Sequence, residues 1–415
     1  MGRQALRHIL TVCFLGLVLF TASLSRSQLT PSFVGDISLF VLCLLLVGVT
    51  FWNGNLQIQI PISILVPIGA LFALAVLHVL FGNFDTPTLA VWPFYTMPIA
   101  IVLITIVPTL IRQQTVFRVV SWFAALLGII GMFVIFVQPI PIPILDVELS
   151  RWSGAGVPFP AVAAMRSIET NPNTSGILFA VGAFSSLYNI LERRNYEDGI
   201  LLFITFISLY LTQSRGGLVL FGISTVILLV YRYSTPQIGS AVIGFGVISA
   251  VFLVVSLLIG PPLAPLVSFV SFTGRVEIWK AAISALSMEP TFNILFGPGI
   301  INTSTWIAPF LPGSLSGTSI HGSYFYLLRF GVLGPILWIC AIWGTIAARA
   351  TKSNIDQLSF SLLVGFAFLM IFENVNVFGT DITSVLLSLL LGYLYLGQSI
   401  QISIPPETIR KILKR

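Results

Sequence analysis

Apolar stretches long enough to cross a membrane recur along the whole chain, separated by short polar segments. A transmembrane helix needs about 20 predominantly apolar residues. Twelve such stretches lie near 9–25, 33–52, 60–82, 89–111, 117–138, 172–190, 198–212, 216–232, 238–260, 322–347, 358–378 and 381–399. The pattern predicts an all-α, polytopic integral membrane protein with about twelve transmembrane helices.

Composition supports this prediction and removes other classes of protein. Of the 415 residues, 56% are hydrophobic and 8% are charged, whereas soluble domains carry about 25% charged residues. The net charge of +6 comes from Lys and Arg residues dispersed between apolar stretches, so membrane lipid rather than nucleic acid is the expected partner. The three cysteines lie inside apolar stretches, and no carboxylate pair on the outer side has ligand spacing. We therefore expect neither a metal nor a cofactor.

Positively charged residues indicate the orientation, because cytoplasmic segments of membrane proteins are enriched in Lys and Arg. With the N-terminus inside, thirteen of the 20 Lys and Arg residues are cytoplasmic: Arg3, Arg7, Arg112, Arg118, Arg193, Arg194, Arg232, Arg349, Lys352, Arg410, Lys411, Lys414 and Arg415. Six lie outside: Arg26, Arg151, Arg166, Arg215, Arg275 and Lys280. We expect both termini in the cytoplasm. The first stretch also fits a cleaved signal peptide, but it continues to Ser25 and many spans follow.

Two predicted outer segments are too long to be simple turns. They divide the chain into a five-helix region at 1–138, an outer loop at 139–171, membrane helices at 172–260, a large outer loop at 261–321 between spans nine and ten, and membrane helices with a cytoplasmic tail at 322–415. In the large loop, apolar residues at 278, 279, 282, 283 and 286 predict an amphipathic helix at 275–286, which would fit in the plane of the membrane interface. Long ordered loops are usually functional, so chemistry is expected on the outer face.

Two arginines and one histidine are candidates for that chemistry. Arg215 lies between two apolar stretches, where paired glycines and a following helix N-terminus favour a bound anion; an arginine snorkelling to lipid headgroups is the alternative. Arg275 opens the amphipathic helix, and its alternative is a solvated arginine paired with a neighbour such as Glu277. His321 lies where the large loop re-enters the membrane, and it is the only histidine that this topology places outside.

Arg329 falls within the predicted tenth span. It follows His321 by eight residues, which would place it on the same helix face and about 12 Å deeper at 1.5 Å per residue. A buried cation there needs a counter-charge or an anionic ligand. We expect Glu373 to be its partner, because the next helix runs back outward to a similar depth. An ion pair that holds the bundle together is the alternative to a substrate-binding role.

Taken together, these motifs resemble the O-antigen ligase and O-antigen polymerase family. That family has an SRG element at the outer start of a helix, a GR…W element in a large periplasmic loop, a glycine turn, and a histidine at the start of the next span. The matching residues are Ser214-Arg215-Gly216, Gly274-Arg275 to Trp279, the glycines of 297–299, and His321. The likeness covers roughly residues 170–395. Gly322 departs from it, because many relatives have a polar residue after the histidine.

The resemblance implies a glycosyltransferase of the GT-C type of architecture in the cytoplasmic (inner) membrane. Such proteins transfer a glycan, with inversion, from a polyprenyl diphosphate to an acceptor hydroxyl, without a metal or a nucleotide sugar. It implies that Arg215, Arg275 and Arg329 bind the diphosphate, since guanidinium groups hydrogen-bond phosphate oxygens bidentately. It also implies that His321, Arg215 and Arg275 are catalytic, with His321 either taking the acceptor proton or donating to a phosphate oxygen.

The sequence leaves alternatives open for the acceptor and for the class of protein. The acceptor can be lipid A core, a growing glycan or a protein, so ligase, polymerase and oligosaccharyltransferase activities all remain possible. A secondary transporter is the main alternative from another class, because it also commonly has twelve spans with both termini inside. Transporters place polar residues and broken helices near the midplane of two related halves. Here the largest loop is asymmetric and charge within spans is scarce, which favours the transferase over a transporter or a scaffold protein.

Overall fold

The part of the chain that the structure describes is almost entirely helical. This computed structural model describes residues 3–52, 57–137, 140–142, 147–150, 164–259, 274–352, 355–395 and 400–403. The membrane-region helices are α1 (Arg3–Leu24), α2 (Ser32–Trp52), α3 (Ile62–Leu80), α4 (Pro87–Ile101), η1 (Val102–Ile106), α5 (Val107–Leu110), α6 (Gln113–Val137), α7 (Pro172–Arg193), α8 (Tyr196–Leu211), α9 (Arg215–Tyr233), α10 (Pro236–Ile259), α15 (Ser323–Tyr326), η4 (Leu327–Phe330), α16 (Leu333–Ala350), α17 (Gln357–Leu369) and α18 (Ile382–Leu394).

The remaining elements are short and are of two kinds. The helices among them are α12 (Arg275–Ser287), α13 (Thr291–Phe296), α14 (Thr303–Ile307), η2 (Ala308–Phe310) and η3 (Gly313–Leu315). Two antiparallel ladders pair β1 (Gln57–Ile60) with β4 (Ile400–Ser403) and β2 (Ile140–Ile142) with β3 (Val147–Leu149). These four strands of three or four residues contribute no packed layer, so the all-α architecture predicted from the sequence is confirmed.

Helices occupy all twelve positions at which spans are predicted, but not all of them are equally long. Eight helices in the described residues are long and apolar enough to cross a membrane: Ser32–Trp52, Ile62–Leu80, Pro87–Leu110, Gln113–Phe136, Pro172–Arg193, Arg215–Tyr233, Pro236–Leu258 and Leu333–Ala350. The apolar parts of α1, α17 and α18 are shorter, and α8 has 16 residues. The architecture is that of a polytopic membrane protein, while a count of twelve spans remains a prediction.

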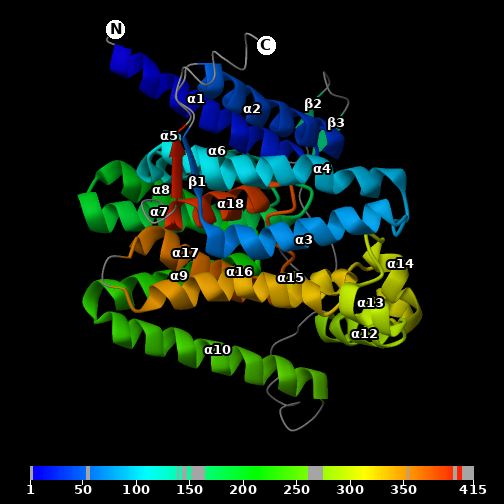
Figure 1. Ribbon diagram of the computed structural model, residues 1–415. Coiled ribbons are helices and arrows are strands. Elements are labelled where there is room, and N and C mark those ends of the chain that lie inside the picture. The colour runs from blue at the N-terminus through cyan, green and yellow to red at the C-terminus, as the bar shows by residue number, and fades with distance from the viewer. Residues whose placement is uncertain are drawn as a thin grey trace.

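Figure 1 shows the long helices running side by side, from α1 and α2 at one edge of the bundle to α10 at the other. The short helices α12, α13 and α14 gather at one end; we call residues 275–320 the cap, and this end of the bundle the cap end. The α1–α2 and α3–α4 turns, and the starts of α7 and α18, also lie at the cap end, because residues from all four line one cavity there. The structure thus confirms that these predicted outer segments share one side.

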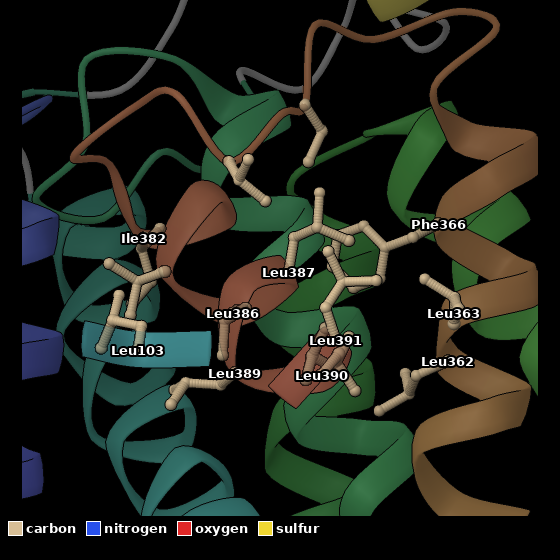
Figure 2. Close-up of a cluster of buried hydrophobic side chains, with 14 of the residues drawn as sticks. Leu103, Leu362, Leu363, Phe366, Ile382, Leu386, Leu387, Leu389, Leu390 and Leu391 are labelled. Carbon is tan, nitrogen blue, oxygen red and sulfur yellow. The ribbon is translucent and has the colours of Figure 1, made fainter. Parts of the chain in front are cut away.

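The centre of the bundle is α18, which lies inside the protein rather than against lipid. All 13 of its residues are buried, as expected for a helix that is apolar on every face. Figure 2 shows Leu386, Leu387 and Leu390 of α18 among Phe366 of α17 and neighbouring leucines. A helix of this length covers about 20 Å at 1.5 Å per residue, so the flanking helices must complete the thickness of the membrane region.

The predicted tenth span, 322–347, is not one helix. It is divided into α15, η4 and α16, with left-handed backbone at Gly322 (φ 87°) and Gly331 (φ 65°). A Cβ on Gly331 would lie 2.3 Å from the carbonyl oxygen of Leu295, so the break permits a backbone contact with the cap. The expectation that Arg329 continues the helix face of His321 is therefore wrong.

The predicted amphipathic helix is confirmed as α12. Ile278, Trp279, Ala282 and Leu286 are buried, whereas Ile283 is exposed. The buried face packs in a cluster with residues of α14, η2 and α15, so protein rather than the membrane interface covers much of it.

Candidate active site at the cap end

A cavity of about 700 Å³ opens at the cap end, between the cap and the starts of several membrane helices. Two of the predicted site residues, His321 and Arg329, line it. Its other polar lining residues are Arg26, Thr86, Thr88, Thr170, Asn171, Asn173, Thr174, Asn302, Thr303, Ser319, Tyr326, Glu373, Asn374, Asp381 and Thr383. The N-terminal third of the chain, for which the sequence predicted spans but no site, supplies part of this wall.

Three long helices begin at the cavity wall. Thr86, Asn171 and Asp381 are the N-caps of α4, α7 and α18, and each side chain accepts a hydrogen bond from a backbone N–H of its own first turn. The N-terminus of a helix carries a partial positive charge. At α4 and α7 this charge meets neutral caps and favours a negatively charged ligand, whereas at α18 the Asp381 carboxylate already offsets it.

Arg329 is the buried cation of the cavity. Only 3% of the residue is exposed, and its Cζ lies 4.8, 4.2 and 4.9 Å from the ring centres of Trp92, Tyr326 and Phe330. Its Nε and Nη2 atoms are buried without a hydrogen-bond partner in the described part of the chain. The expected ion pair with Glu373 is not formed, so the side chain has no carboxylate partner in the described part of the chain.

Glu373 pairs with Arg275 instead. The Nη2 atom of Arg275 donates to Oε1 of Glu373, and Asn173 donates to the same oxygen at 3.2 Å. Both charged side chains are mostly buried, with 15% and 10% exposed. Burial raises the pKa of the Glu373 carboxyl, and the positive charge of Arg275 opposes this shift. The sequence prediction thus assigned this partner to the wrong arginine.

His321 lies beside this ion pair and on the cavity wall. The indole N–H of Trp279 donates to the His321 carbonyl at 2.9 Å, and the Trp279 ring stacks on Phe325 with ring centres 4.7 Å apart. Burial lowers the pKa of His321, and the nearby Arg275 lowers it further. The imidazole is therefore neutral near pH 7 and can accept a proton.

Arg215 lies apart from the cavity lining, although its neighbour reaches the ion pair. It is the exposed first residue of α9, behind the N-cap Ser214. A Cβ on Gly216 would lie 3.1 Å from Cγ of Glu373, so the absence of a side chain lets α9 begin against the Arg275–Glu373 pair. The proposed contact of Arg215 with a diphosphate remains a prediction.

The glycine turn at 297–299 holds the backbone of Arg329 in place. Gly299 donates its N–H to the Arg329 carbonyl at 3.0 Å, and a Cβ on Gly297 would meet that same oxygen. His78, near the end of α3, has its Nε2 atom 2.9 Å from the Phe296 carbonyl. His78 therefore also lies at the cap end, which the sequence analysis missed. Two features of the sequence could have placed His78 there. The third predicted span runs outward, and His78 lies near its outer end.

No protein-family model matches the chain, and comparison with curated proteins finds no match. Within the residues that the structure describes, no three His, Cys, Asp or Glu side chains are grouped to hold a metal ion. The function is therefore inferred from the residues of the cavity and from the motif resemblance.

Proposed function

We propose that the protein is a glycosyltransferase that takes a glycan from a polyprenyl diphosphate carrier and passes it to an acceptor hydroxyl at the outer face of the cytoplasmic membrane. The proposed reaction inverts the anomeric centre, needs no metal, and belongs to the O-antigen ligase or polysaccharide polymerase type. The observation that carries the proposal is Arg329, a buried guanidinium without a carboxylate partner in the described residues, on the wall of a cavity that also contains His321.

The energetics of Arg329 favour an anionic ligand. Burying a charged group costs several kcal/mol after relaxation of the protein, whereas a cation–π contact returns about 0.5–2 kcal/mol. The three aromatic rings therefore offset much of this cost but leave two donors unused. A diphosphate supplies acceptor oxygens in the planar geometry that a guanidinium group matches. The helix N-termini of α4 and α7, which have neutral caps, add to the same attraction.

The site also has the groups that a single displacement requires. His321, neutral near pH 7, accepts the proton of the acceptor hydroxyl. The acceptor oxygen then forms a bond to the anomeric carbon, while the bond from that carbon to the diphosphate oxygen breaks and the electron pair leaves with the phosphate. Donors fixed near the departing oxygen stabilise the charge that develops. Attack from the opposite face inverts the anomeric centre.

The Arg275–Glu373 ion pair makes the two arginines of the site, Arg275 and Arg329, unequal in net positive charge. Arg275 is neutralised by Glu373, so in this geometry Arg329 provides the larger attraction for a diphosphate. The pair fixes the start of α12, and with it Trp279, which donates to the backbone of His321. We therefore assign Arg275 and Glu373 to the support of the base as well as to the donor site.

Glycan transfer by the purified protein tests the proposal. The donor is a polyprenyl-diphosphate oligosaccharide, supplied with EDTA and without nucleotide, and the acceptors are lipid A core, the same glycan, and a peptide. We expect transfer to one of these acceptors, which identifies the acceptor class. His321→Ala should reduce this transfer about 100-fold or more. A divalent-metal requirement contradicts the metal-free mechanism. Solute movement into proteoliposomes without any transfer supports a transporter instead.

A further inference from the structure

A second cavity lies at the end of the bundle opposite the cap. It has a volume of about 500 Å³, and three arginines line it: Arg112, Arg118 and Arg193. Asn171, at the first cavity, precedes α7, and Arg193 ends it; these 22 residues span about 33 Å at 1.5 Å per residue. The two cavities are therefore separate sites at the two ends of one helix.

The charges on this second cavity are unbalanced. Glu197 is the one acidic residue in its lining, and it pairs with Arg118 at 2.6 Å. Arg193 donates from Nη2 to the neutral side chain of Gln114 at 2.5 Å. Within the described part of the chain neither Arg112 nor Arg193 has a carboxylate within ion-pair distance. The cavity wall therefore carries a net charge of about +2 when its ionised side chains are counted.

The hydrogen bonds of Arg118 and Arg193 hold these two side chains in place but leave most of their N–H donors available. A guanidinium group carries five N–H donors, and the hydrogen bonds that Arg118 and Arg193 donate to Glu197 and Gln114 each engage one nitrogen. The remaining donors suit a phosphate group, which binds guanidinium forks bidentately. A phosphodiester or a phosphate monoester both have this chemistry.

The surface beside the cavity distinguishes between these two ligands. Trp122 lines the cavity, and Leu126, Ile129 and Phe133 continue from it along α6 at spacings of four, three and four residues, which is one face of a helix. All four side chains are at least half exposed in the protein. A ligand held by its phosphate in the cavity thus has an apolar stripe on which hydrocarbon chains can lie.

We propose that this cavity binds an anionic phospholipid, with the phosphate between Arg112, Arg118 and Arg193 and an acyl chain along the α6 stripe. The tryptophan at the start of the stripe is typical of the depth at which lipid head groups meet hydrocarbon. Basic cavities between membrane helices bind such head groups. This proposal is independent of the glycosyltransferase activity, because no residue of the first cavity takes part in it.

Lipid binding to the full-length protein in neutral detergent tests the proposal. Phosphatidylglycerol, phosphatidylcholine and soluble glycerol phosphate are titrated separately, with native mass spectrometry counting bound molecules and the apparent Tm reporting stabilisation. Phosphatidylglycerol is expected to bind and to raise Tm. The Arg112→Gln, Arg193→Gln double variant is expected to weaken binding about tenfold or more, since two charge-assisted contacts are lost. The Arg118–Glu197 ion pair stays intact in this variant.

A matched control removes the same charge outside the cavity. The Arg194→Gln, Lys352→Gln double variant lacks two positive charges that do not line the cavity, and it is expected to bind phosphatidylglycerol like wild type. Equal loss in this control would show attraction by general surface charge and overturn the proposal. Equal binding of phosphatidylcholine, or competition by glycerol phosphate at the same concentration as the lipid, would also overturn it. If the double variant fails to fold, Arg112→Gln alone provides the same comparison.

Discussion

Replacing Arg329 with Met separates a ligand-binding arginine from a structural one. The substitution removes the charge and keeps an unbranched apolar side chain, which is shorter than arginine because it lacks the guanidinium group. In the wild type, burial of the guanidinium costs several kcal/mol, and three aromatic contacts return about 0.5–2 kcal/mol each. These contributions offset one another in large part, so Arg329→Met is expected to lower the free energy of unfolding by less than about 3 kcal/mol, the lower end of the cost of breaking a buried ion pair.

Arg275→Met provides the contrast, because it leaves the carboxylate of Glu373 buried without its partner. Breaking a buried ion pair on one side costs about 3–5 kcal/mol. The assay is unfolding by SDS titration in mixed micelles, followed by tryptophan fluorescence, with both variants measured beside wild type. If Arg329→Met loses as much stability as Arg275→Met, the arginine is a structural cation and the anion-site reasoning is wrong.

Three further predictions concern the base, the broken span and the orientation. Because the pKa of His321 is lowered, transfer should be constant above about pH 6.5, the usual histidine pKa, and fall only in more acid solution; a fall that persists in His321→Gln would assign it to another group. Gly331→Ala should destabilise the protein by at least about 1–3 kcal/mol, because its backbone angles of φ 65° and ψ −163° suit glycine alone. Gly344→Ala is the control, since nothing lies within 4 Å of the new Cβ, and it should be neutral. In a cysteine-free background, an impermeant thiol reagent should label Ser314→Cys but not Asn195→Cys in intact cells, and the reverse result would invert the topology.

Hydropathy located the helices, because burial in lipid or in the bundle centre imposes the same apolar composition. It did not distinguish α18, which is wholly buried, from a span that faces lipid. It also did not detect the break at Gly331, the residue that ends η4. A hydropathy window of 20 residues averages over the conformation of a single residue. Local pattern was sufficient for α12, whose helical face of apolar residues follows directly from its sequence.

The candidate site was predicted less completely than the helices. Motif spacing grouped Arg215, Arg275 and His321, and position within the tenth predicted span added Arg329. Of these four residues, His321 and Arg329 line the cavity, whereas Arg215 and Arg275 do not. Pairing by depth then gave Glu373 the wrong arginine, because the contact joins residues 98 positions apart through the packing of the cap. The N-caps of α4, α7 and α18 carry no unusual sequence signal, so their meeting at one cavity required the three-dimensional arrangement.

Binding of a polyprenyl-diphosphate donor to purified Arg329→Met is the decisive measurement of whether Arg329 holds the diphosphate. Arg194→Met, an exposed arginine at the opposite end of α7, serves as the charge-matched control. We expect Arg194→Met to bind the donor like wild type. Arg329→Met should keep its fold and bind the donor at least about tenfold more weakly, because one charge-assisted contact is lost. Wild-type donor binding and transfer by a folded Arg329→Met would contradict this expectation.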